Sequence, residues 1–534
     1  MTTLGTALRK RLENTIREAR EVADEAAADA VARLAIADAR PPAYLSDRQK
    51  ALRRRLRAHA RSLGDKLDAD DTMETRRLAE AIAYEHWHRM LFGRFLVERD
   101  LLIHPKHGVP ISRGDLKELA EEEGFADEWE LVERFAAPTL PAVFKPDDPV
   151  LELELDPHFQ LRLRRLVTEL PEQVFAADDS LGWTYQFWRA AERKLVDQAV
   201  KETGIKIGSV ELPAVTQLFT EPYMVKFLLH NTLGAWWAGK LLAANSDLAR
   251  NAPDEDVLRR ACALPGVEWE YLRFVHEEDD GNWKPDAGSF PGWPKRAAEI
   301  TYCDPCCGSG HFLVEAFGML AALRQAEEGL SPAEAACAVL RDNLFGLEID
   351  GRCVQIAAFN IALAAWRLAD GPVDLPVPHI AWVGAPPPLP KSQFVALANR
   401  DGELQRGLGA LHDLFRQAPL LGSLIELSGG DLVDPTRVAR IEQSIAALVD
   451  KMRGAEPELA EGALAARGMA DAAAILSRWF TLEATNVPFL GRGKQHIDLA
   501  GHLKTGLKPP SPISRRPCWS ACGGSRNQLA QSLQ

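Results

Sequence analysis

The chain has 534 residues, of which 46% are hydrophobic and 26% charged, and its formal net charge is −13. This composition is ordinary for a soluble globular protein with room for two to four domains. The N-terminus lacks the apolar region of a signal peptide, and no stretch reaches the roughly 18 apolar residues of a spanning helix. We therefore expect a cytoplasmic protein without a membrane segment. The negative charge argues mildly against a nucleic-acid binder, although a local cleft can be basic on an acidic protein.

The eight cysteines do not form the framework of a disulfide-rich fold. Three of them crowd one segment, at Cys303, Cys306 and Cys307. A Cys-x-x-Cys pair suggests zinc, but a closed site needs a second pair at ligand spacing. The only other close pair, Cys518 and Cys522, lies in a compositionally different tail. We expect no metal.

Residues 1–205 are predicted to be mainly α-helical. Apolar residues recur at helical spacing from Leu8 to Ala26, and Pro41-Pro42 ends that helix. A second helix begins near Ser46 and carries a run of seven basic residues up to Arg61. This run could lie on DNA phosphates, but a solvated face balanced by the upstream acids is the favoured interpretation. A third, aromatic helix is predicted over residues 81–103.

After residue 205, apolar strand-like runs alternate with amphipathic helices, which is typical of a parallel α/β sheet. We expect this core to occupy residues 206–500, with a loop over about 277–297 leading into the first strand. Residues 501–534 form an irregular tail, since no Asp or Glu follows Asp498 and four prolines interrupt any regular element.

The most informative segment surrounds residues 298–323. It predicts a short strand ending at Asp304, a tight loop from Pro305 to Gly310, and a helix with Phe312 on its buried face. A glycine loop between strand and helix lets a ligand approach the backbone closely, and the helix N-terminus favours an anion. There is no Gly-Lys-Ser/Thr of a phosphate loop, and Leu313 stands where a dinucleotide fingerprint needs a third glycine.

A second strand is predicted downstream, over residues 343–350. A capping-box helix starts at Ser331 before it, and a long helix from Arg352 follows it. Glu348 ends this strand, where an acid can accept hydrogen bonds from ribose hydroxyls. Asp350 is expected to cap the following helix instead.

The string Asp304-Pro305-x-x-Gly308-Ser309-Gly310-x-Phe312 closely resembles motif I of adenine-specific DNA methyltransferases. The resemblance implies that this loop wraps the methionine part of S-adenosylmethionine and that Glu348 is the acid of motif II. Upstream, the segment from Val215 to Val225 resembles motif X, which implies that Phe219 and Thr220 contribute to the cofactor site. For motif III, Ser423 and Asp431 both remain candidates.

The catalytic motif of this class is Asn/Asp-Pro-Pro-Tyr/Phe, and the chain has Asn486-Val487-Pro488-Phe489. A flipped-out adenine presents a weakly nucleophilic amine. Acceptors on its two hydrogens draw the nitrogen toward sp³ geometry, and an aromatic ring holds the base by stacking. Asn486 and Phe489 can perform these roles, with Pro488 shaping the motif. Val487 replaces the usual first proline.

The motif order resembles the large adenine methyltransferases of phage-defence systems of the BREX or DISARM kind, and type IIG-like methylases. It implies a class I S-adenosylmethionine-dependent fold with a Rossmann-like sheet. It also implies double-stranded DNA as substrate, within a restriction-modification or defence system that could include other subunits. Two alternatives stay open: an inactive cofactor-binding remnant or scaffold subunit, and a methyltransferase that acts on RNA or protein.

Proteins of this kind continue for hundreds of residues past the catalytic motif, with three further strands and a region that reads bases in the groove. We therefore expect a frameshift or premature stop near residues 495–500, which leaves the sheet incomplete. The expected consequence is weak cofactor binding and little methylation by this chain.

Overall fold

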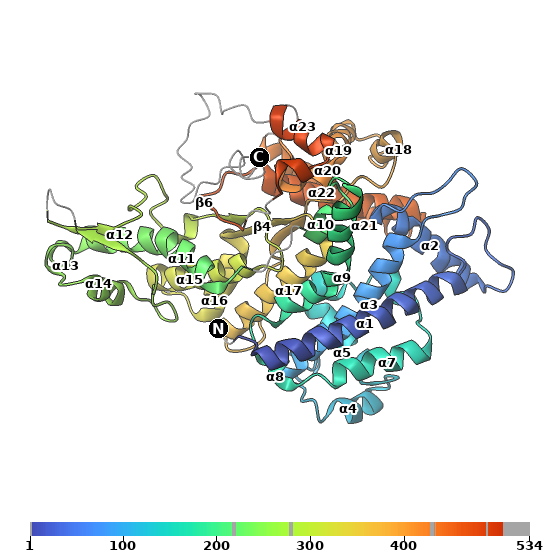
Figure 1. The fold of residues 1–534 in the computed structure, drawn as a ribbon, viewed down its shortest axis with the longest axis horizontal. Helices are drawn as coiled ribbons and strands as arrows, with labels where there is room; N and C mark the ends of the chain where they lie inside the picture. Colours follow the sequence, from blue (N-terminus) through green and yellow to red (C-terminus); the bar gives the residue numbers. More distant parts are fainter. Residues whose placement is uncertain are drawn as a thin grey trace. The chain divides into compact units, whose positions relative to one another are not determined.

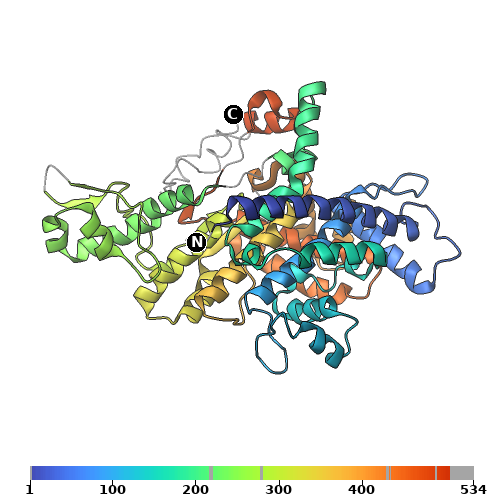
Figure 2. The same ribbon diagram turned by 60° about the horizontal axis from the view of Figure 1, so that its bottom comes forward.

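The computed structural model describes residues 3–215, 220–276, 281–427, 432, 434–486 and 490–505. The chain divides into two compact units, each built from separate segments. Unit 1 comprises residues 1–195, 383–419 and 425–477, and unit 2 comprises residues 196–382, 420–424 and 478–534. Figures 1 and 2 show the elements in two views. Two parts of the expected 206–500 core thus cluster with the N-terminal helices.

Unit 1 is helical, and its described residues contain no strand longer than an isolated bridge. Its helices are α1 (Thr6–Arg33), α2 (Asp47–Leu63), α3 (Arg76–Glu98), α4 (Leu116–Glu123), α5 (Glu128–Thr139), α6 (Pro141–Phe144), η1 (Pro149–Glu152), α7 (Pro157–Thr168), α8 (Glu172–Ala176), α18 (Lys391–Ala396), α19 (Gly402–Phe415), α21 (Pro435–Met452) and α22 (Pro457–Leu476). Two helices, α9 (Ser180–Thr203) and α20 (Ala418–Leu421), cross the division between the units.

Part of the basic run on α2 makes hydrogen bonds and an ion pair within unit 1. This helix begins after Ser46, as predicted, and Ser46 and Gln49 form a capping box. Arg53 is buried and donates to the carbonyl of Ala35 at 3.0 Å, and Arg57 donates to the carbonyl of Ile36 at 2.6 Å. Arg55 pairs with Glu152 at 2.6 Å. Arg53 and Arg57 thus hold the turn after α1 and Arg55 contacts η1, whereas Arg48 and Arg54 are exposed.

A partly buried ionic contact joins α2 to α22, which lies about 400 residues later in the chain. Nδ1 of His59 lies 3.2 Å from both carboxylate oxygens of Glu461, and its Nε2 lies 3.8 Å from Asp148. Burial lowers the pKa of His59, but the two carboxylates outweigh it and leave this pKa above its ordinary value. The protonated ring therefore stabilises the packing of the inserted helix α22 on α2.

Unit 2 contains all the strands of the described residues. Its elements are α10 (Leu212–Val215), α11 (Pro222–Leu229), η2 (His230–Gly234), α12 (Ala235–Ala244), α13 (Ser246–Asn251), α14 (Glu255–Cys262), β1 (Phe274–His276), β2 (Trp283–Pro285), η3 (Ala297–Glu299), β3 (Tyr302–Asp304), α15 (His311–Glu328), α16 (Pro332–Asp342), β4 (Leu344–Glu348), α17 (Gly351–Leu368), β5 (His379–Trp382), η4 (Gly422–Leu424), β6 (Leu482–Glu483), η5 (Arg492–Lys494) and α23 (Ile497–Thr505).

Four of these strands form a parallel sheet in the order β5-β4-β3-β6. Every residue of β3 and β4 is buried, as expected for strands covered on both faces. Leu313 of α15 packs against Gly346 on one face, while the ring of Phe345 stacks on His379 and contacts Phe480. Unit 2 therefore has an α/β architecture built on a parallel sheet.

The expectation of alternating strands from residue 205 onward was wrong. The described residues between 206 and 273 form helices, and the central sheet begins only at β3. A short antiparallel hairpin of β1 and β2 precedes it, partly within the segment expected to be a loop. Apolar runs such as that of α12 cannot be assigned to helix or strand from hydrophobicity alone. Among the described residues, no helix combines the length and apolarity needed to cross a membrane.

The ionic contact of His59 predicts a specific pH dependence. A group whose pKa is raised by folding stabilises the folded state fully below its ordinary pKa of 6.5, and this contribution is lost as the pH rises through the folded-state pKa. As the pH rises above 6.5, we expect the free energy of unfolding to fall by more in the parent than in His59→Gln. Denaturant titrations at several pH values measure this difference. Parallel pH profiles of the two proteins would contradict it.

Candidate functional site

The candidate site lies at the carboxyl end of β3. At this strand, the direction in which successive strands are added to the sheet reverses. From β3 the chain proceeds to β4 and β5 on one side, and it later returns to place β6 on the other side. In open parallel sheets, ligands bind outside the carboxyl ends of the strands at such a switch point. The segments that follow β3, β4 and β6 carry the residues predicted from motifs I, II and IV.

The loop from Pro305 to Gly310 has the tight conformation predicted from its glycines. Gly308 and Gly310 have φ angles of +53° and +89°, which L-residues with side chains adopt only with strain. A Cβ on Gly310 would lie 3.1 Å from the backbone of Ala357, so the loop packs directly on α17. A Cβ on Gly308 would meet nothing within 4 Å, so this part of the loop borders open space.

Two contacts fix the loop from neighbouring elements. The amide of Asn360 on α17 donates to the carbonyl of Ser309 at 2.7 Å, and the N–H of Cys307 donates to the carbonyl of Leu347 on β4 at 3.0 Å. The N–H of Gly310 donates back to Cys307 at 2.8 Å, and α15 begins at the next residue. Phe312 is buried in the first turn of that helix.

Glu348 reaches from the end of β4 to the loop after β3. One carboxylate oxygen accepts from the N–H of Gly308 at 2.8 Å, and the other accepts from the N–H of Asp350 at 3.0 Å. Each oxygen retains acceptor capacity, because a carboxylate has about four lone-pair sites. Asp350 caps α17 through the N–H of Arg352 at 3.0 Å, as predicted.

Asp304 connects the loop to the segment after β6. Its carboxylate accepts from the N–H of Cys306 at 3.1 Å, and the hydroxyl of Thr485 donates to the carbonyl of the same Cys306 at 3.5 Å. In addition, the hydroxyl of Tyr302 donates to the carbonyl of Ala484 at 2.9 Å. These contacts bring the start of motif IV beside motif I, although about 180 residues separate them in the sequence.

The two carboxyl groups of the site are difficult to ionise. Burial raises the pKa of Asp304 to about 7, and the hydrogen bonds from Thr485 and Cys306 only partly counteract it. Burial likewise raises the pKa of Glu348 to about 7, against the lowering effect of the N–H groups of Asp350 and Gly308. Buried carboxyl groups with raised pKa values beside an open glycine loop are typical of a functional site.

Of the two motif III candidates, Ser423 lies next to the loop. It is buried in η4, and its hydroxyl lies 3.6 Å from the sulfur of Cys306. Asp431 lies outside the described residues. Burial raises the pKa of both Cys306 and Cys307, so these thiols stay protonated. No group of three or more potential metal ligands occurs among the described residues.

The remaining predicted residues are only partly described. Asn486 is exposed directly after Thr485, whereas Pro488 and Phe489 lie outside the described residues. From motif X, Phe219 also lies outside them, while Thr220 is half-buried just before α11. The segment of motif X runs into α11, and α11 packs on α15, the helix that follows the loop of motif I.

Sequence reasoning missed two residues that hold the site together, Thr485 and Asn360. Both had a local signal: Thr485 directly precedes Asn486, and Asn360 interrupts an otherwise apolar helix face. Both residues contact the segment of motif I, which contains Asp304 and Ser309 and lies far from them in the sequence. Those partners could not be identified without the fold.

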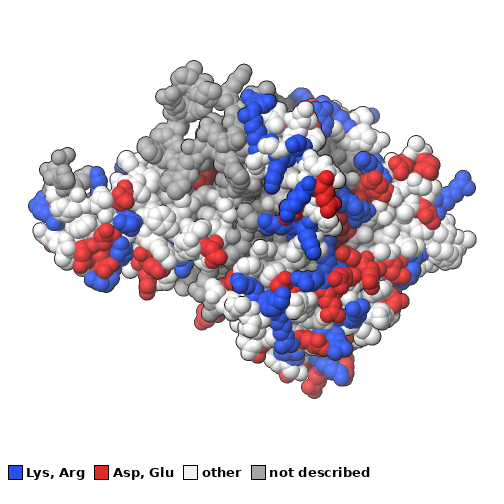
Figure 3. All heavy atoms as spheres, in the orientation of Figure 1, with Lys and Arg blue, Asp and Glu red and all other residues white. Residues whose placement is uncertain are grey.

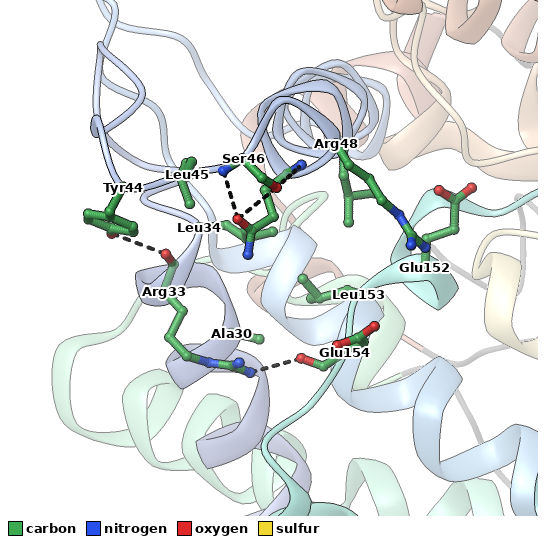
Figure 4. A pocket seen from close by; sticks show the side chains of 12 residues that line it. Ala30, Arg33, Leu34, Tyr44, Leu45, Ser46, Arg48, Glu152, Leu153 and Glu154 are labelled. Carbon is green, nitrogen blue, oxygen red and sulfur yellow. Dashed lines mark hydrogen bonds between the residues drawn. The ribbon is translucent and has the colours of Figure 1, made fainter. Parts of the chain in front are cut away.

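Unit 1 has a separate cavity of about 630 Å³ at the start of α2. Figure 4 shows that its polar groups largely bond to one another. The hydroxyl of Tyr44 donates to the carbonyl of Arg33 at 3.1 Å, and the Arg33 guanidinium donates to the carbonyl of Glu154 at 2.8 Å. Ser46 and Gln49 form the capping box of α2. The cavity is explained by helix capping, and the site at β3 is the stronger candidate.

Comparison with known proteins identifies the class of this domain. Residues 289–371, from just before β3 to the end of α17, match the family model described as the DNA-methyltransferase domain of MmeI. The match therefore covers the glycine loop and Glu348.

Two curated relatives match a longer part of the chain. It is 28% identical over 369 residues to the adenine-specific methyltransferase PglX of Lacticaseibacillus casei (strain Zhang), which covers 68% of this chain and 28% of that protein. It is 28% identical over 229 residues to the adenine-specific methyltransferase BrxX of Escherichia coli O9:H4 (strain HS), covering 42% and 17%. The chain thus spans less than a third of the length of either relative.

A third relative, the type II methyltransferase M.VspI of Vibrio sp. (strain 343), is 34% identical over 71 residues, or 13% of each chain. These similarities confirm the expected resemblance. The chain is similar to adenine-specific methyltransferases over up to 68% of its length, and its residues 289–371 match the model of a DNA-methyltransferase domain.

The conformation of Gly310 predicts an asymmetric pair of glycine variants. Gly310→Ala requires a positive φ and places a Cβ against Ala357, so we expect it to lower the free energy of unfolding by about 1–3 kcal/mol. Gly318→Ala is the control, because that glycine lies within α15 and an added Cβ meets nothing within 4 Å. The control should be neutral or stabilising by up to about 1 kcal/mol. Equal stability of the two variants in denaturant titrations would show that the loop does not require glycine.

Proposed function

We propose that this domain binds S-adenosylmethionine and transfers its methyl group to the exocyclic amine of adenine in DNA. The observation that carries the proposal is the convergence at β3 of three segments: the loop before α15, Glu348 after β4, and Thr485-Asn486 after β6. The similarity to adenine-specific methyltransferases supports the choice of reaction and substrate. The sheet order supports a class I, Rossmann-like fold for the domain.

The residues present fit this cofactor. The space beside Gly308 leaves room for a ligand against the loop backbone. Glu348 has acceptor capacity left on both oxygens after its two backbone hydrogen bonds, which suits a pair of ribose hydroxyls. The backbone N–H groups at the start of α15, together with Ser309 and Gly310, would face the methionine carboxylate. When bound, the cofactor supplies an electrophilic methyl group on a sulfonium.

On the substrate side, Asn486 is exposed two residues after Ala484, whose carbonyl accepts from Tyr302 of β3, and we propose that it receives a flipped adenine. Its side-chain oxygen would accept a hydrogen bond from the target amine and orient the nitrogen lone pair. Pro488 would shape the backbone and Phe489 would stack on the base. Phe219, Thr220 and Ser423 would complete the cofactor pocket from motifs X and III.

The names of the relatives further suggest a role in a defence or restriction-modification system in the cytoplasm, with double-stranded DNA as substrate and other subunits as partners. The chain spans less than a third of the length of those relatives, so we propose this role for the whole system to which the chain would belong.

The cofactor assignment is tested at Glu348. Replacement by Ala removes a buried charged acceptor, so S-adenosylmethionine binding should weaken by about 1.5–3 kcal/mol in calorimetric titrations. Asp374→Ala, which removes an exposed acid of the same unit, is the matched control and should bind normally. Because the pKa of Glu348 is about 7, affinity in the parent should also rise between about pH 6 and pH 8, as the carboxylate ionises. Unchanged affinity in Glu348→Ala would refute the assignment.

The catalytic assignment is tested at Asn486 and Phe489. Removing a directed acceptor of the transition state typically slows a reaction about 10²–10³-fold. In a full-length relative or a repaired version of this protein, the variant equivalent to Asn486→Ala should therefore nearly abolish transfer of a labelled methyl group to duplex DNA. Cofactor binding should stay intact in this variant. Phe489→Ala should mainly weaken capture of the base, by about 1–3 kcal/mol, since it loses the stacking partner. A methylating preparation whose rate is unaffected by Asn486→Ala would exclude this residue from catalysis.

A further inference from the structure

A compact group of cations follows directly after the catalytic motif. Arg492 and Lys494 belong to the short turn η5, and Lys206 comes from the segment before α10. We call these three residues the basic turn. All three side chains are exposed. Within the described part of the chain, none of them has a carboxylate at ion-pair distance, unlike Arg259 and Arg324 of the same unit.

The basic turn is held by backbone contacts and by one buried side chain. The N–H of Ile207 donates to the carbonyl of Lys494 at 2.7 Å, and the N–H of His496 donates to the carbonyl of Ile207 at 3.0 Å. The ammonium of Lys206 donates to the carbonyl of Gly493. Buried Gln495 donates to the carbonyl of Leu490 at 2.9 Å and closes the turn from within. The three cations are therefore presented from an ordered scaffold.

The position of this turn relative to Asn486 limits what it can contact. Arg492 follows Asn486 by six positions in the sequence, which places the two at most about 20 Å apart even in an extended chain. Each DNA strand carries one phosphate per roughly 3.4 Å of helix axis. The cations thus lie within about six nucleotides of a base held by Asn486. Figure 3 shows Lys and Arg side chains gathered around the region where Figure 1 places α10 and α23, the helices that follow Lys206 and Lys494.

We propose that the basic turn contacts phosphates of the DNA strand that carries the target adenine. The inference rests on the proposed function and deepens it by assigning a DNA-binding surface. Cations without carboxylate partners attract phosphates without regard to sequence, and such contacts fix the position of a protein on the duplex. The turn would hold the strand beside the base that Asn486 receives. It would add affinity but no base recognition.

The test measures binding of the full chain to a fluorescent duplex of about 30 base pairs with mixed sequence, over a series of salt concentrations. Each lost phosphate contact lowers the slope of log K against log salt by about 0.9, so Arg492→Gln with Lys494→Gln should reduce it by about 1.8. Arg250→Gln with Arg260→Gln is the matched control, because it removes two exposed charges of α13 and α14 in the same unit. The control should keep the parent slope.

A charge-conserving variant, Arg492→Lys with Lys494→Arg, should also retain the parent slope, because the interaction depends on charge. The inference is overturned if the neutral variant matches the control, if the charge-conserving variant loses as much binding as the neutral one, or if duplex RNA is bound more tightly than DNA. It is also overturned if the parent binds no duplex. Titration of the same proteins with S-adenosylmethionine decides the proposed function separately, since the basic turn lies outside the cofactor site.

Discussion

The pairing of β3 with both β4 and β6 is the constraint on which the rest of the site depends. Parallel strands point their carboxyl ends to the same edge of the sheet, so this pairing gathers loops from residues 305, 349 and 484 onward. The contacts of Glu348 with Gly308 and of Thr485 with Asp304 then follow from strand register. If β6 paired elsewhere, Asn486 would be separated from the glycine loop.

This arrangement buries two carboxylic acids, and their desolvation opposes folding. Asp304 and Glu348 are almost fully buried, and each would be more stable ionised in water, as their raised pKa values show. Backbone N–H groups offset part of this desolvation, but no Lys or Arg among the described residues forms a salt bridge with either acid. A site that served only stability would pair or replace such groups. A ligand with hydroxyl or cationic groups would supply partners for the acceptor sites that remain on these carboxyl groups.

Local features of this site could be read from the sequence, and long-range ones could not. The capping box at Ser331, the cap at Asp350 and the strand–loop–helix around Gly308 depend on residues within a few positions of one another. The helices between residues 206 and 273 were misassigned because a fully buried helix and a buried strand both appear as apolar runs. The clustering of residues 383–477 with the N-terminal helices involves contacts such as that of His59 with Glu461, which nothing local indicates.

Charge also has to be evaluated residue by residue. In the run on α2, Arg53 and Arg57 are bound to backbone carbonyls and Arg55 to a carboxylate, while Arg48 and Arg54 are exposed but belong to unit 1, which does not contain the candidate site. Arg492 and Lys494 are fewer but exposed, with no carboxylate partner in the described residues. A cation that already neutralises a carboxylate or satisfies buried carbonyls has little attraction left for a phosphate. The net charge of −13 therefore does not argue against a nucleic-acid surface, because what matters is which cations remain without partners near the site.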